Sequence, residues 1–295
     1  MVLTRPLILV TGKNGQLGSS LQAIANQFQQ FDFLFTGKEN LDITKEEIVQ
    51  FYFKKYKPSF CINAAAYTAV DLAETDQEQA SLINIKAVSN LAKACKEFSC
   101  IFLHISTDYV FRGDQQRPYL ETDITDPVNF YGYTKRAGEE QALAVCAQTF
   151  IIRASWLYSE YGKNFVKTML NLFQTKKEIA VVGDQFGAPT YAKNLSEALL
   201  KICSQPIENL LHQAGIYHFS DKGNITWFDF ASEIKKQTGT LCHINKITTE
   251  EYPTPAKRPH YSVFNTSKFK TNFELEMKDW KNSLASCLHQ LGQSG

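Results

Sequence analysis

A tyrosine and a lysine four residues apart are the first candidates for chemistry in this sequence. Tyr131 and Lys135 lie in the stretch FYGYTKRAGEE, which runs from residue 130 to residue 140. Residues at this spacing share one face of a helix, one turn apart. An ammonium beside a phenol stabilises the phenolate and lowers the tyrosine pKa, so the pair predicts an acid or base that works near neutral pH. The alternative is an exposed helix face on which the two side chains do no chemistry.

Three glycines, Gly12, Gly15 and Gly18, follow a short apolar segment in the motif TGKNGQLG. In such a turn the backbone can approach a pyrophosphate, which the free N–H groups of the next helix then bind. The spacing is G-x-x-G-x-x-G rather than the commoner G-x-G-x-x-G, and three glycines also fit a purely structural turn. The second apolar segment, in FLFTGKENLD, has no acid at its tip for ribose hydroxyls. Lys38 stands nearby instead, which favours the 2′-phosphate of NADP.

The elements that must position these residues alternate along the first half of the chain. Apolar segments that read as strands occupy residues 6–10, 31–35, 60–63, 100–106 and 149–155. Helical patterns lie between them, at about 16–28, after a capping box of Thr44 and Glu47, at 77–98 and at 127–146. Strands that are apolar throughout and alternate with helices predict an α/β fold, a Rossmann-type doubly wound parallel sheet. Ligands of such sheets bind at the carboxyl ends of the strands.

The pattern weakens after Trp156, where turn-rich and proline-rich segments predict a smaller C-terminal substrate-binding part. We therefore expect a dinucleotide-binding domain at 1–155, joined by about 191–220. The substrate-binding part is expected at 156–190 and 221–295.

Composition excludes several classes of protein. The 295 residues carry a net charge of +1, with acids and bases balanced, which argues against a nucleic-acid partner. The apolar run at the N-terminus leads directly into the glycine turn and does not read as a signal peptide, and no segment is apolar for long enough to span a membrane. Seven cysteines without a C-x-x-C pair predict reduced thiols, mostly in the core, and a cytoplasmic protein.

Taken together, the motifs TGKNGQLG, STDYVF and YGYTK give the chain a resemblance to the extended short-chain dehydrogenase/reductase family. NAAAYTAVDLAE, IIRASWLY, VVGDQFGAPTYA and PAKRP extend the resemblance over nearly the whole chain. Within the family it is most similar to reductases of a dTDP-sugar. This resemblance implies that NADPH or NADH reduces the C4 ketone of dTDP-4-dehydro-L-rhamnose to dTDP-L-rhamnose. That reaction is the last step in the supply of this sugar for cell-surface polysaccharide.

The resemblance also implies roles for single residues. Tyr131 gives a proton to the C4 carbonyl oxygen, Lys135 lowers the tyrosine pKa and holds the nicotinamide ribose, and Thr107 hydrogen-bonds the same carbonyl. The other cofactor-binding residues are expected to be Gly12, Asn14, Gly15, Gln16 and Leu17 at the pyrophosphate, Asp42 and Ile43 at the adenine, and Ala64, Ala65 and Ala66 beside the adenosine. The residues expected to face the sugar nucleotide are Thr68, Val70, Tyr109, Trp156 and Arg258.

Two other functions stay open at this point, and the first is another sugar-nucleotide enzyme, a dehydratase or an epimerase. Dehydratases of the family are similar to one another in an acidic pair after the catalytic threonine, whereas here Asp108 is followed by Tyr109. The second alternative is a binding protein that is not an enzyme. The regulatory subunit of methionine adenosyltransferase resembles this chain in the glycine turn and the Tyr-Lys pair, and it binds NADP without catalysing a reaction. It departs from the pattern at Trp156 and the DQFGAPTYA loop, which favours the reductase.

Metal and assembly are the last expectations. Some magnesium-dependent dimers of the family carry glutamates near the first helix, where this chain has Ser19 and Ser20. Since magnesium prefers carboxylate oxygens, we expect no metal site, and a homodimer stays an alternative to a monomer.

Overall fold

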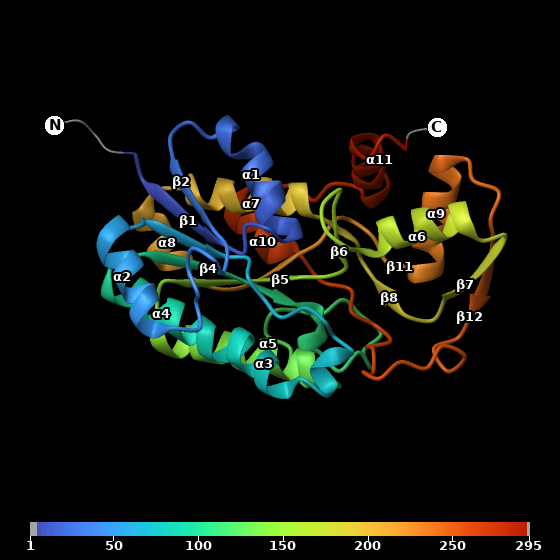
Figure 1. Ribbon diagram of the computed structural model, residues 1–295, viewed down its shortest axis with the longest axis horizontal. Helices are drawn as coiled ribbons and strands as arrows, with labels where there is room; N and C mark the ends of the chain where they lie inside the picture. Colours follow the sequence, from blue (N-terminus) through green and yellow to red (C-terminus); the bar gives the residue numbers. More distant parts are fainter. Residues whose placement is uncertain (1–4, 294–295) are drawn as a thin grey trace.

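A six-stranded parallel sheet forms the centre of the computed structural model, which describes residues 5–293. Its strands run in the order β2-β1-β3-β4-β5-β10 (Figure 1). Every neighbouring pair is parallel, and the order reverses between β1 and β3. The strands are β1 Leu7–Thr11, β2 Asp32–Thr36, β3 Phe60–Asn63, β4 Ile101–Thr107, β5 Thr149–Ala154 and β10 Gly215–Phe219. The predicted doubly wound fold is confirmed.

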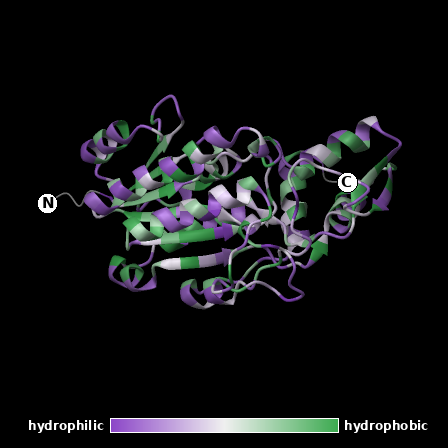
Figure 2. Ribbon diagram, turned by 90° about the horizontal axis from the view of Figure 1, so that it is seen from below, coloured by the Kyte–Doolittle hydropathy of each residue, from purple (hydrophilic) through white to green (hydrophobic). Residues whose placement is uncertain are grey.

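Helices cover both faces of the sheet. Successive side chains of each strand point to opposite sides, so both faces carry apolar side chains that the helices bury. Ile8 and Val10 of β1 belong to one hydrophobic cluster, and Leu9 belongs to the other. The first cluster contains α1 Gln16–Ile24, α7 Ala192–Cys203, α8 Ile207–Gln213 and α10 Ser267–Phe273. The second contains α2 Glu46–Tyr56, α4 Ala87–Glu97 and α5 Phe130–Val145. Figure 2 shows the green, hydrophobic ribbon gathered in the strands between these two layers.

A smaller part with its own hydrophobic core lies beside the carboxyl ends of the strands (Figure 1). Its longer elements are α6 Phe165–Thr175, β7 Glu178–Val182, α9 Trp227–Thr238, β12 His243–Ile247 and α11 Trp280–Gln290, with β7 and β12 paired in parallel. Its short strands pair as β6 Leu157–Tyr158 with β9 Thr190–Tyr191, and as β8 Phe186–Gly187 with β11 Ile225–Thr226. Within the range expected for this part, α10 packs instead on β10 of the central sheet. The division of the chain at numbered boundaries stays a prediction.

Two helices differ from their expected form. Thr44 does not cap α2, which begins after Lys45; the Thr44 hydroxyl donates instead to the Asp42 carboxylate at 2.6 Å. The helix expected at 77–98 is divided into α3 Gln77–Ser81, a π-helical turn at Leu82–Lys86 and α4. Single π-turns inside helices are frequent at functional sites, and this one contains a buried asparagine described below.

All seven cysteines are buried and unpaired, as expected for core thiols. Between residues 5 and 293, no helix combines the length and the apolar character needed to cross a bilayer.

Candidate active site

Two adjoining cavities lie at the carboxyl ends of the strands, with volumes of about 270 and 540 Å³, and the larger one borders the smaller part. Both are lined by Gly15 and by Ala64–Ala66. The smaller cavity is also lined by Gly12, Asn14, Lys38, Asp42 and Ile43. The larger is also lined by Gln16, Leu17, Thr68, Val70, Thr107, Tyr109, Tyr131, Lys135 and Trp156. The structure thus brings together every residue expected at the cofactor and the substrate except Arg258.

Each glycine of the first turn has its own structural reason. Gly12 has a φ of +72°, and a Cβ there would lie 2.6 Å from the Ala65 nitrogen. A Cβ on Gly18 would collide with the Gly12 carbonyl oxygen. Gly15 instead lines both cavities and precedes the first residue of α1, whose N-terminus has no side-chain cap. The N–H groups of that first turn have no partner within the helix, so they are suited to bind a phosphate.

The smaller cavity is lined by the residues expected at the adenosine half of the cofactor. The Asp42 carboxylate accepts hydrogen bonds from the Thr44 hydroxyl and backbone N–H, and the hydroxyl is the main reason why the Asp42 pKa is lowered. The acid next to Lys38, Glu39, is paired with Lys13 at 2.7 Å and does not line the cavity. Lys38 therefore lines the smaller cavity, while the carboxylate of the next residue, Glu39, lies outside it.

The larger cavity holds the tyrosine and the lysine together. Both come from α5, which begins at Phe130 because the Asn129 side chain caps the Gly132 N–H at 2.8 Å. Tyr131 is 8% exposed and Lys135 is 2% exposed, so the reading of an exposed helix face is wrong. Thr107, the last residue of β4, lines the same cavity, and the Lys135 ammonium donates to the Ile105 carbonyl at 2.7 Å.

The pKa of Tyr131 differs in direction from the expectation. Burial raises it, the Thr107 hydroxyl acts against the rise, and Asp108 adds to it. Burial also lowers the pKa of Lys135 to about 8, although Glu139 acts in the opposite direction. In this geometry burial raises the Tyr131 pKa more than any lowering by Lys135, whose ammonium is bonded to a carbonyl. A raised pKa keeps the Tyr131 phenol protonated at neutral pH, which is the form that a proton donor needs.

A buried asparagine that sequence reasoning missed fixes the loop after β3. The Asn84 amide lies in the π-helical turn and exchanges hydrogen bonds with the backbone N–H and C=O of Tyr67, at 2.9 and 3.0 Å. It also donates to the Thr134 hydroxyl of α5 at 3.0 Å. The loop that carries Ala64–Thr68 is thereby tied to the helix that carries Tyr131. The one signal in the sequence was an amide in the middle of an apolar helix face.

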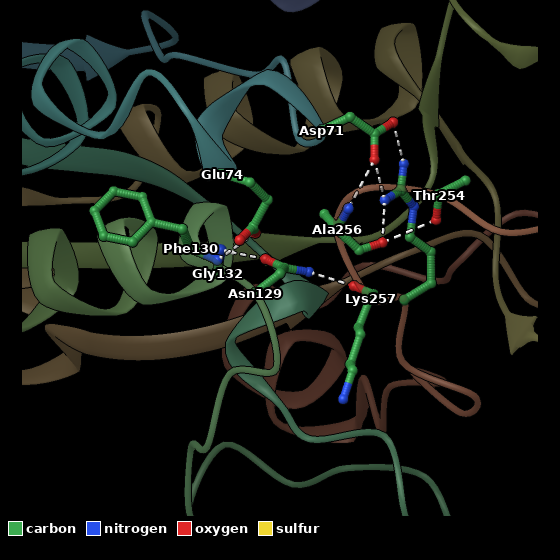
Figure 3. Close-up of polar contacts among 9 residues, drawn as sticks. Asp71, Glu74, Asn129, Phe130, Gly132, Thr254, Ala256 and Lys257 are labelled. Carbon is green, nitrogen blue, oxygen red and sulfur yellow. Dashed lines mark hydrogen bonds and ion pairs between the residues drawn. The ribbon is translucent and has the colours of Figure 1, made fainter.

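Arg258, expected at the sugar nucleotide, is held by another side chain. Its guanidinium donates two hydrogen bonds of 2.7 Å to the two oxygens of Asp71 and a third to the Ala256 carbonyl. Figure 3 shows Asp71 and Ala256 together, with the Asn129 amide donating to the Lys257 carbonyl nearby. These contacts fasten the proline-rich loop at 250–262 to the N-terminus of α5. Arg258 lines neither cavity, so its role at the ligand stays a prediction.

Trp156 has an uncommon backbone conformation and stacks on a second tryptophan. It has a φ of +47°, and its ring stacks on Trp227 with centroids 3.5 Å apart. A Cβ on Gly187 would collide with the Trp156 indole, so only glycine fits there without a shift. Trp227, the first residue of α9, lines the larger cavity as well and was not expected from the sequence.

Comparisons with known proteins agree on one group of relatives. The sequence model of the family described as RmlD substrate binding domain matches residues 6–293. The chain is 42% identical to the dTDP-4-dehydrorhamnose reductase of Escherichia coli (strain K12), over 96% of this chain and 97% of that one.

Solved structures give the same result. A dTDP-4-dehydrorhamnose reductase from Clostridium acetobutylicum ATCC 824 superposes with a TM-score of 0.91 at 39% identity, over 97% and 99% of the two chains. The dTDP-4-dehydrorhamnose reductase of Bacillus anthracis str. Ames, solved in complex with NADP, superposes with a TM-score of 0.90 at 37% identity, over 97% and 100%.

Proposed function

The chain belongs to the RmlD substrate binding domain family, and from this premise we propose that it is the NADPH-dependent reductase that converts dTDP-4-dehydro-L-rhamnose to dTDP-L-rhamnose. The observation that carries the proposal is the buried group of Thr107, Tyr131 and Lys135 in a cavity that continues to the N-terminus of α1. Relatives that are matched over nearly their whole length are reductases of this sugar nucleotide. The reaction is the last step of dTDP-rhamnose synthesis.

Each residue of the group has a part in the reduction of a ketone. The nicotinamide supplies the hydride, and the protein must neutralise the charge that develops on the carbonyl oxygen. We assign the proton to Tyr131, whose raised pKa keeps the phenol protonated until that charge appears. The Thr107 hydroxyl hydrogen-bonds the same oxygen, and both groups stabilise the transition state more than the ground state. The Lys135 ammonium donates to the Ile105 carbonyl. We assign this cation to the nicotinamide ribose, which it would bind.

The assay that tests this function mixes the protein with reduced nicotinamide cofactor and dTDP-4-dehydro-L-rhamnose. We expect oxidation of the cofactor together with formation of dTDP-L-rhamnose. Binding of NADP without any oxidation would support a regulatory binding subunit. Release of water from a dTDP-hexose would support a dehydratase, although Tyr109 offers no carboxylate at that position and packs edge-on against Tyr131.

Lys38 leads to a prediction about the cofactor. The lysine lines the adenosine cavity, and Glu39 is paired with Lys13. We expect a mild preference for NADPH over NADH in kcat/KM, because a cation stabilises the 2′-phosphate. Lys38→Ala should remove that preference by raising KM for NADPH alone, with exposed Lys57→Ala as the control. Equal kcat/KM for both cofactors, unchanged in Lys38→Ala, would show that this lysine does not select the cofactor.

A second prediction is that turnover needs no divalent metal. The Ser19 hydroxyl donates to the Lys13 carbonyl, and Ser20 is 2% exposed, so neither offers an accessible charged ligand. In residues 5–293, no three His, Cys, Asp or Glu side chains are grouped so that they could hold a metal ion. We expect the same rate and the same solution mass with excess chelator and with added magnesium. Loss of activity, or a change from dimer to monomer on chelation, would contradict this.

We further propose that the enzyme acts in the cytoplasm, supported by its unpaired thiols. Its partner is the dTDP-sugar, and a homodimer stays an alternative to a monomer.

A further inference from the structure

The larger cavity contains a cation to which the proposed mechanism gives no role. Of the described residues that line this cavity, two are cationic, Lys135 and Lys163. Lys135 is buried and bonded to the Ile105 carbonyl. Lys163 is exposed and makes no ion pair with any residue of the described chain. Arg258, the cation expected at the sugar nucleotide, is paired with Asp71 and does not line this cavity.

Lys163 belongs to a turn, Ser159–Asn164, that is fastened to the first residue of α1. The Gln16 carboxamide oxygen accepts hydrogen bonds from the Ser159 hydroxyl at 3.1 Å and from the Asn164 amide at 3.0 Å. Its amide nitrogen donates to the Leu157 carbonyl at 3.4 Å. Gly162 has a φ of +62°, and a Cβ there would lie 3.2 Å from the Gln16 Cγ. The turn therefore lies directly against the N-terminus of α1.

The turn also has a fixed shape of its own. Asn164 caps α6 by accepting from the Lys167 N–H at 3.2 Å, while its amide donates to the carbonyls of Ser159 and Tyr161. Lys163 thus belongs to a turn that is held on both sides, and it lines the same cavity as Gln16 and Leu17 in the first turn of α1. A helix N-terminus and a lysine that line one cavity favour the same ligand, a polyanion.

We propose that Lys163 binds a diphosphate in this cavity and that Gln16 positions the turn that presents it. This inference rests on the proposed function, in which two ligands contain a diphosphate: the nicotinamide cofactor and the dTDP-sugar. An ammonium that reaches a phosphate oxygen in a partly enclosed cavity forms a charge-assisted hydrogen bond. Such a contact is commonly worth a factor of about ten or more in affinity.

The test compares Lys163→Met with Lys163→Arg and with Lys176→Met, which removes an exposed charge at the end of α6. Binding of NADP and of dTDP is measured separately by titration calorimetry, without turnover. We expect Lys163→Met to raise the Kd of one of the two by about tenfold, less at high salt, while Lys163→Arg and Lys176→Met change it little. A rise for NADP identifies the cofactor diphosphate, and a rise for dTDP identifies that of the sugar nucleotide. Unchanged Kd values for both ligands would overturn the proposal.

A second variant tests the positioning role of Gln16. Gln16→Ala should weaken binding of the same ligand, and in that background Lys163→Met should lose most of its effect, because residues that act together are not additive. Full additivity of the two changes would overturn the role of Gln16.

These binding measurements stay separate from the proposed function. A protein that binds NADP and dTDP but reduces no keto sugar nucleotide would refute the reductase and leave the result for Lys163 standing. Failure of the wild-type protein to bind either ligand would overturn both proposals.

Discussion

Tyr131→Phe is expected to reduce kcat by about 10²- to 10⁴-fold, the usual contribution of a positioned general acid. The change removes only the hydroxyl that would donate to the carbonyl oxygen. The ring remains, so its edge-on contact with Tyr109, with centroids 5.6 Å apart, should persist together with the shape of the cavity. The measurement is turnover of dTDP-4-dehydro-L-rhamnose at saturating NADPH.

Two controls make this result specific to the phenol. Tyr133→Phe removes the same atom from the same helix at a position that is 51% exposed, and turnover should not change. The Kd of NADP should also stay near its wild-type value in Tyr131→Phe, because no cofactor charge depends on the hydroxyl. A loss of less than tenfold would exclude Tyr131 as the proton donor.

The parts of the fold that were predicted correctly are those that local patterns determine. Five strands of the sheet were recognised because each is mostly apolar, and β1 shows why: Ile8 and Val10 pack on one face and Leu9 on the other. The first glycine turn was recognised because Gly12 and Gly18 each occupy a place where a Cβ would collide with backbone. Such steric requirements act over a few residues and can be read without knowledge of the fold.

The features that could not be predicted depend on tertiary contacts. Arg258 reads as a free cation beside prolines, but its partner Asp71 lies 187 residues away in the chain. The spacing of Tyr131 and Lys135 predicts that they share a helix face, but it does not show how deeply they are buried. Burial raises the Tyr131 pKa, whereas the spacing alone predicts a lowered one. Trp227 could not be identified at the cavity, since an aromatic residue at the start of a helix is equally suited to the core.

A buried ion pair beneath the catalytic helix leads to the prediction with the largest effect on stability. Glu139 follows Lys135 by one helical turn on α5, and its carboxylate accepts from the Arg153 Nε at 2.9 Å and from a terminal guanidinium nitrogen at 2.6 Å. Each side chain is 3% exposed. Phe111 lies under the guanidinium, with its ring centroid 5.0 Å away. Because both side chains are buried, loss of the carboxylate charge would leave the charged guanidinium without a counter-ion.

Glu139→Gln is therefore expected to lower the free energy of unfolding by about 3–5 kcal/mol, the usual cost of an uncompensated buried charge. Glu140→Gln is the matched control, because its partner Arg136 and Glu140 itself are exposed and such pairs contribute about 0–1 kcal/mol. Urea unfolding of both variants measures the difference. Replacing the pair together, in Glu139→Met with Arg153→Met, should restore part of the loss, since no charge is then left buried.

The loss of Glu139 also removes the group that raises the pKa of Lys135 against burial, so this pKa should fall below about 8. Lys135 would then be less fully charged at neutral pH, and the KM for NADPH should rise in Glu139→Gln but not in Glu140→Gln. Equal stability of the two single variants would mean that Arg153 finds another partner, for which His218, 3.4 Å from the guanidinium, is the nearest candidate.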